Sequence, residues 1–149
     1  MDNLQLSNQI CFPIYSVSRL ITKAYKPYLD EMGITYPQYL VLMVLWENDH
    51  LSVNQISEKL LLNTNTISPL LKRMEKLDLI KRNRSSKDER SVNVQLKNKG
   101  KLLKDKAKPI PEQLLKILLN DNIELSDVIQ LKGILNHCIE VLTDNNKTK

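Results

Sequence analysis

The sequence is poor in glycine, in large aromatic residues and in long apolar runs. Its 149 residues include only three glycines, one phenylalanine and one tryptophan. Leucine, lysine, asparagine and isoleucine are abundant instead, and this bias favours a mainly helical protein with few, short strands. No apolar run reaches the roughly 20 residues of a membrane span, and the N-terminus lacks a basic segment followed by an apolar one. We therefore expect a cytoplasmic protein.

Residues that bind metals or form structural disulfides are also scarce. The two cysteines, Cys11 and Cys138, form no CxxC pair, and the two histidines, His50 and His137, show no metal-ligand spacing. We expect neither a metal nor a cofactor. In a reducing compartment both thiols would be free, so any role of theirs would be redox chemistry. Nothing beyond Cys11 suggests a catalytic pocket, and we do not expect an enzyme.

The positive charge is concentrated in one stretch. The net charge is +5, and residues 72–90 hold eight basic against four acidic residues, which leaves +4 there. A basic balance suits a polyanionic partner but does not by itself define a fold.

Around this stretch the pattern predicts a helix-turn-helix. Thr35 with Gln38, and Ser52 with Gln55, form two capping boxes that each begin a helix. The segment Tyr39–Trp46 is apolar throughout and should be buried on all sides. A short second helix and a tight turn at residues 62–64 precede a third helix, whose apolar side carries Ile67, Leu70, Leu71, Met74 and Leu77.

A β-hairpin with a polar tip follows, over residues 79–84 and 91–96. Short polar side chains at the start of the third helix suit base edges, its basic residues suit phosphates, and the hairpin tip suits a minor groove. A charged, solvated surface or a protein-binding winged helix is the alternative. The predicted DNA-binding residues are Asn63, Thr64, Asn65, Thr66, Ser68, Lys72, Arg73, Lys76, Arg84, Lys87, Asp88 and Arg90.

Helices also flank this unit. Apolar residues from Ile10 to Met32 form a narrow stripe on a long helix, in which Pro13 predicts either a kink or a start near Phe12. After the hairpin, residues 98–108 should be helical, and Pro109 and Pro111 should break that helix. A last helix around residues 125–142 precedes a polar tail, which we expect to fray. Its apolar side carries Val128, Leu131, Leu135 and Leu142.

Several segments carry a resemblance to a known family. NQICFPIYSVSR, YKPYLDEMGITYPQYLVLMVLWE, ISPLLKRMEKLDLIKRNRSSKDERSV and KPIPEQLL resemble the MarR family, and within it the organic hydroperoxide resistance regulators. The DxRxV element of the wing is Asp88, Arg90 and Val92. The resemblance implies a winged helix-turn-helix homodimer with interlocked N- and C-terminal helices. Residues 1–149 would then be one domain, with 36–97 binding DNA and 5–35 and 98–143 forming the dimer.

The resemblance also implies a redox role for Cys11. As a thiolate it would attack a peroxide, with tyrosines supplied across the dimer as hydrogen-bond donors. The matching positions are Tyr25 and Tyr36, with Tyr15 nearby. A resolving cysteine of some relatives would fall near Lys116, where none is present, and we expect Cys138 to be a buried packing residue.

These features predict a repressor that leaves an inverted-repeat operator when an organic hydroperoxide oxidises Cys11. Oxidised Cys11 could end as a mixed disulfide with a small thiol, as a disulfide with Cys138 or as an overoxidised acid. The alternatives are release by a small aromatic or phenolic ligand, or a broader redox and virulence regulator. A thiol peroxidase and an architectural DNA protein have less support in the residues.

Overall fold

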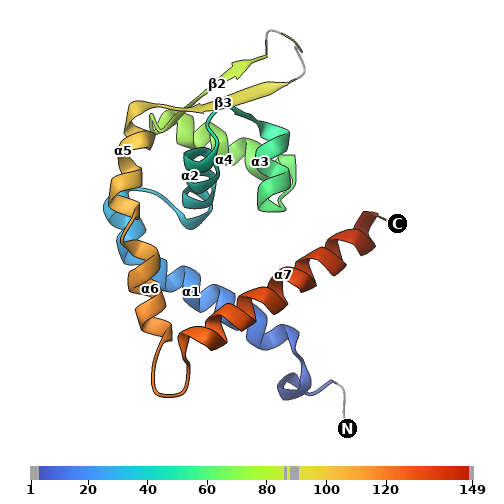
Figure 1. The fold of residues 1–149 in the computed structure, drawn as a ribbon. Coiled ribbons are helices and arrows are strands. Elements are labelled where there is room, and N and C mark those ends of the chain that lie inside the picture. The colour runs from blue at the N-terminus through green and yellow to red at the C-terminus, as the bar shows by residue number, and fades with distance from the viewer. Residues whose placement is uncertain (1–3, 86, 88–90, 148–149) are drawn as a thin grey trace. The chain divides into compact units, whose positions relative to one another are not determined.

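The computed structural model describes residues 4–85, 87 and 91–147 (Figure 1). The chain forms two compact units, one ending at Ile110 and one beginning at Pro111. The elements of the first unit are a 3₁₀ turn at Leu6–Asn8, α1 (Cys11–Met32), α2 (Tyr36–Glu47), β1 (Leu51–Ser52), α3 (Val53–Leu60), α4 (Thr64–Lys76), β2 (Ile80–Arg84), β3 (Val92–Leu96) and α5 (Asn98–Ala107).

Helix α1 begins at Cys11, which settles the two possibilities that Pro13 left open. Pro13 is the third residue of the helix, in the first turn, where its missing backbone donor has no helical partner to lose. Pro27, which the sequence pattern did not flag, lies inside α1 without ending it. The helix closes at Gly33, whose φ of 68° is the left-handed conformation that glycine adopts without strain.

Helix α2 is the centre of the first unit. Its predicted capping box is confirmed, because the Gln38 side chain accepts from the Thr35 backbone N–H at 2.9 Å. The expectation of burial on all sides is wrong in part. Tyr39, Val41, Leu42, Val44 and Leu45 are buried, whereas Leu40, Met43 and Trp46 are only half-buried.

Helices α3 and α4 form the predicted helix-turn-helix. The Ser52 hydroxyl accepts from the Gln55 backbone N–H at 3.1 Å and so caps α3, which ends at Leu61 in a left-handed conformation. The apolar side of α4 is confirmed for four residues. Ile67, Leu70, Leu71 and Met74 are buried, and only Leu77, just past the helix end, is exposed.

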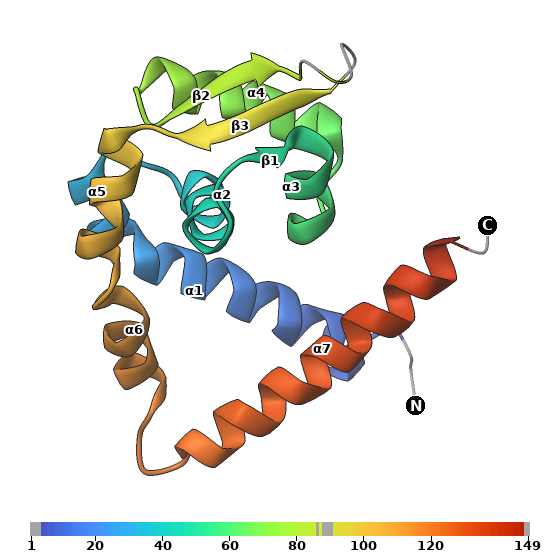
Figure 2. The same ribbon diagram turned by 45° about the horizontal axis from the view of Figure 1, so that its top comes forward.

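The hairpin is part of a three-stranded antiparallel sheet (Figure 2). Strand β3 pairs with β2 over Ile80↔Leu96 to Arg84↔Val92, as predicted. It also pairs with β1 through Leu51↔Val94, a contact that the sequence did not predict. The strand order β1–β3–β2 with the helices α3 and α4 is the winged helix arrangement.

The second unit consists of α6 (Ile110–Leu118) and α7 (Leu125–Lys147). The break that Pro109 and Pro111 predict is present between α5 and α6, although it is short. The expectation of a frayed tail is wrong as far as Lys147, where α7 ends, and residues 148–149 lie outside the described residues. Among the residues described, no helix is long and apolar enough to cross a membrane.

Candidate DNA interface and redox site

The start of α4 presents the polar side chains that the sequence singled out. Asn63 is the N-cap residue, and its side chain makes no capping hydrogen bond with any described residue, so its amide group is available to an outside partner. Thr64, Asn65 and Thr66 in the first turn are exposed, while Ser68 is half-buried. Four of these five side chains are therefore free to reach base edges.

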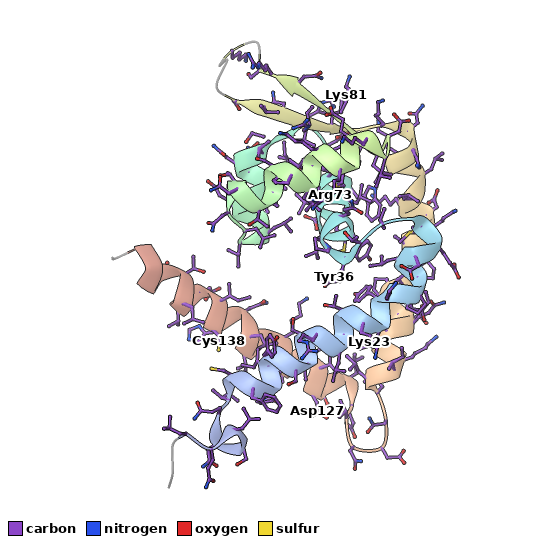
Figure 3. All side chains as sticks on the ribbon, turned by 180° about the vertical axis from the view of Figure 1, so that it is seen from behind. Lys23, Tyr36, Arg73, Lys81, Asp127 and Cys138 are labelled. Carbon is purple, nitrogen blue, oxygen red and sulfur yellow. The ribbon has the colours of Figure 1, made fainter. Side chains whose placement is uncertain are left out.

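The basic side chains of α4 lie away from the core. Lys72, Arg73 (labelled in Figure 3) and Lys76 are exposed, and none of them forms an ion pair within the part of the chain that the structure describes. Two of the three occupy the last turn, where the helix dipole also favours a cation. These three positive charges are therefore available to an anionic partner outside the chain.

A charge-assisted clamp ties α4 to the hairpin. The Glu75 carboxylate accepts from the Arg82 backbone N–H at 2.9 Å, from Nε at 3.1 Å and from Nη2 at 2.7 Å. The side-chain hydrogen bonds from Arg82 hold the pKa of Glu75 below its ordinary value. These three hydrogen bonds fix the position of β2 relative to α4. Because the Arg82 charge is already paired with Glu75, it contributes little to binding an anionic ligand.

The hairpin tip is only partly described. Arg84 is exposed at the end of β2, and the Lys87 backbone N–H donates to the Ser85 hydroxyl at 3.2 Å. The predicted wing contacts Asp88 and Arg90 lie outside the described residues.

Cys11 is the first residue of α1, and its side chain is exposed. The apolar residues beside it, Ile10, Phe12 and Ile14, are exposed as well, between 45% and 73%. Cys138 on α7 is also exposed, so the expectation of a buried packing residue is wrong for this chain by itself. Leu131 and Leu142 on the same helix are exposed as well, at 52% and 64%.

Two of the predicted tyrosines come together. The rings of Tyr25 on α1 and Tyr36 on α2 are 5.0 Å apart between centroids, and Tyr39 contacts both. Burial, followed by the charges of Tyr36 and Tyr39, raises the pKa of Tyr25 to about 12. Its hydroxyl therefore keeps its proton at neutral pH and remains a hydrogen-bond donor.

The same chain's Cys11 does not reach this pair. Fourteen residues of continuous helix separate Cys11 from Tyr25, about 21 Å at 1.5 Å per residue. Tyr15 is not in the cluster either: its ring is 61% exposed and lies under the Arg19 guanidinium at 5.4 Å. The Cys11 thiol of the same chain therefore cannot approach the Tyr25–Tyr36 pair.

An open groove runs beside Tyr36, between α1 and the start of α2. Its volume is about 550 Å³, and Arg19 lines it together with Lys23 and Tyr36. Lys23 and Tyr36 are labelled in Figure 3. Lys26 also lines the groove, but its charge is paired with Asp30 at 2.6 Å. No group of three or more potential metal ligands occurs in the described ranges.

Sequence reasoning missed Glu75, Arg82 and Tyr39. A signal for Tyr39 existed, because it follows Tyr36 by three residues and therefore lies on nearly the same side of the helix. No local signal links Glu75 to Arg82, since that contact depends on how the hairpin folds back.

Comparisons with known proteins agree with this geometry. Residues 23–107 match the family described as transcriptional regulator SarA/Rot. The chain is 46% identical over 145 residues to the organic hydroperoxide resistance transcriptional regulator of Bacillus subtilis, which covers 97% of each chain. It is also similar to AbfR of Staphylococcus epidermidis.

Two solved forms of AbfR are informative. Reduced AbfR bound to DNA is 31% identical, with a TM-score of 0.77 over 97% of this chain and 96% of that one. Disulfide-formed AbfR is 34% identical, with a TM-score of 0.63 over 93% of this chain and 95% of that one. The fold and these matches define a winged-helix transcriptional regulator. The chain belongs to the MarR family, in the subgroup of organic hydroperoxide resistance regulators.

Proposed function

We propose that this chain is a redox-sensing repressor that binds an inverted-repeat operator as a homodimer and releases it when an organic hydroperoxide oxidises Cys11. The observation that carries this proposal is the Tyr25–Tyr36 pair. Neither hydroxyl has a hydrogen-bond partner in residues 4–85, 87 and 91–147, and both are half-buried. Two protonated donors without an acceptor suit an anion delivered by a second chain, and the exposed Cys11 side chain of that chain would be such an anion once its thiol has lost the proton.

The reaction at Cys11 is one stoichiometric oxidation. The thiolate sulfur attacks the terminal peroxide oxygen, the O–O bond breaks, and after uptake of one proton the products are a sulfenic acid and the alcohol. The added oxygen changes both the size and the charge of the group that Tyr25 and Tyr36 bind. A single oxidation of this kind makes the protein a sensor that is used once for each peroxide molecule.

The names of the relatives support both parts of the proposal. The Bacillus relative is a regulator of organic hydroperoxide resistance. AbfR is known in a reduced form bound to DNA and in a disulfide form. In this chain, α4 would enter the major groove with Asn63 to Ser68 near base edges, and Lys72, Arg73 and Lys76 would contact phosphates. Such a repressor would act in the cytoplasm, where its operator lies.

The wing would add a second contact. Arg84 and Lys87 lie near its tip in the described part, and Asp88 and Arg90 belong to the same DxRxV element. A guanidinium inserted into a narrow minor groove is favoured by the negative potential there. Residues 36–97 would thus bind DNA, and 5–35 with 98–143 would form the dimer within one domain.

A second candidate function has its own observation. The groove beside Tyr36 is large enough for a small aromatic acid, and the Arg19 and Lys23 charges would attract its carboxylate. In that case a reversible ligand, and not oxidation, would release the operator.

A DNA shift assay with wild-type protein and Cys11→Ser separates the two. We expect both to bind the operator when reduced, and only the wild type to release it after treatment with cumene hydroperoxide. Release of Cys11→Ser at the same peroxide concentration would disprove the redox proposal. Release of both proteins by salicylate would favour the ligand candidate.

A further inference from the structure

Tyr39 lies at the centre of the aromatic cluster, although its side chain is 2% exposed. Its ring is 5.6 Å from that of Tyr25, at an interplanar angle of 44°. It is 6.3 Å from that of Tyr36, at 48°. The three rings form a triangle to which α1 contributes one member and α2 contributes two.

Tyr39 also packs against a further aromatic residue, Trp46. Its ring meets the edge of Trp46 at 6.1 Å, and the Trp46 indole N–H donates to the Gly100 carbonyl at 2.9 Å. Gly100 itself has no room for a side chain, because an added Cβ would lie 2.3 Å from the Leu79 carbonyl oxygen. Tyr39 is therefore fixed between a rigid support and the two phenols of the candidate sensor.

The hydroxyls of Tyr25 and Tyr36 have no such support. Neither donates to an acceptor within the described chain, so no hydrogen bond orients them. Ring packing positions them instead: Tyr25 and Tyr36 pack against each other, and both pack against Tyr39. Hydrogen bonds weaken steeply when the donor angle departs from linearity, so a small rotation of either ring would cost most of a contact.

We infer that Tyr39 is a positioning residue of the peroxide-sensing reaction, which acts through its ring and not through its hydroxyl. This inference depends on the proposed function. The Tyr39 ring keeps Tyr25 and Tyr36 aimed at one point, where the sulfur of the partner chain is stabilised as a thiolate. Without that ring the two phenols rotate into the vacated space, and the thiolate loses its donors.

The test compares Tyr39→Phe, which keeps the ring, with Tyr39→Leu, which removes it. Each reduced protein is mixed with cumene hydroperoxide over a series of pH values, and loss of the Cys11 thiol is followed in a Cys138→Ser background. We expect Tyr39→Phe to react within about twofold of the reference at every pH. We expect Tyr39→Leu to react about tenfold more slowly at neutral pH, with the midpoint of its pH profile displaced upwards by about one unit.

A merely structural role for Tyr39 would lower the stability of Tyr39→Leu without moving that midpoint, which would overturn the inference. Equal slowing of Tyr39→Phe and Tyr39→Leu would also overturn it, since the hydroxyl would then be the active group. Tyr39→Met, which preserves more volume, replaces Tyr39→Leu if that variant does not fold. Failure of the proposed function is recognised separately, because the reference protein would then not react at Cys11 or not release DNA.

Discussion

Individual basic side chains in the DNA-binding unit differ in whether they already form an ion pair within the chain. Arg82 is held by the Glu75 carboxylate through two side-chain bonds, whereas Arg73, two residues before Glu75, has no ionic partner among the described residues. Both are arginines in the basic stretch, where the sequence analysis assigned Arg73 to DNA and gave Arg82 no role. The structure separates an arginine that organises the chain from one that is free to bind a phosphate.

Arg73→Ala should therefore weaken operator binding by about tenfold, or ~1.4 kcal/mol. Loss of one phosphate contact should also reduce the slope of log K against log salt by about one. The measurement is operator affinity by fluorescence anisotropy at several salt concentrations. Lys106→Ala on α5 removes an equal charge far along the chain from α4 and serves as the control. An unchanged slope in Arg73→Ala would mean that this side of α4 does not face DNA.

At the level of elements, local signals predicted most of the fold. The two capping boxes placed the starts of α2 and α3, and the spacing of Ile67, Leu70, Leu71 and Met74 gave the buried side of α4. Strand β1 was missed because two residues are too few for an alternating pattern. Its pairing with β3 joins segments some forty residues apart, which no local rule reports.

In the candidate site, too, local features could be predicted from the sequence and long-range contacts could not. Residues that act through their own exposure, such as Arg73 and Cys11, could be proposed from the sequence. Residues that act through a distant neighbour could not, as Glu75 with Arg82 and Tyr39 with Tyr25 illustrate. The contact of Tyr15 with Arg19 also had no signal in the sequence analysis, although the ten-residue helical spacing between Tyr15 and Tyr25, about 15 Å at 1.5 Å per residue, already keeps Tyr15 out of the cluster.

The clamp between α4 and β2 predicts a pH dependence. Because the pKa of Glu75 is lowered in the folded chain, the clamp contributes stability above the ordinary carboxyl value of 4.5 and loses it as the pH falls through the lower, folded value. Glu75→Gln should thus be less stable than wild type at pH 7, and the difference should shrink below about pH 4. Urea unfolding of both proteins at several pH values measures this.

The matched control for this prediction is Glu112→Gln. Glu112 also has a lowered pKa and pairs with Lys116, but both side chains are largely exposed and lie one turn apart on α6. Such a pair contributes little, so its removal should leave the free energy of unfolding nearly unchanged at every pH. Equal effects of the two substitutions would show that the Glu75 clamp is no stronger than a surface pair.

On the scale of the whole molecule, each of the two compact units exposes apolar side chains on one of its helices. The first unit does so at the beginning of α1, where Phe12, Ile14 and Val17 are each more than 40% exposed. The second does so on α7, where Leu131 and Leu142 are 52% and 64% exposed. Soluble monomers rarely leave such continuous apolar surface open to water, and a second copy related by two-fold symmetry would cover the same surfaces on both chains. The distance between Cys11 and Tyr25 within one chain points to the same arrangement.

Leu131→Glu tests the dimer directly. A carboxylate at the centre of an apolar interface loses its hydration without gaining a partner, so we expect the dimer dissociation constant to rise at least tenfold. Operator binding should fall with it, because a monomer reaches only one half-site. Asn136→Glu adds the same charge on a different side of α7 and should leave both properties unchanged. Sedimentation equilibrium gives the association state, and a DNA shift assay on the same samples gives the binding. If Leu131→Glu remained as dimeric as Asn136→Glu, α7 would not form the interface, and the exposed start of α1 would be left as the surface that joins the two copies.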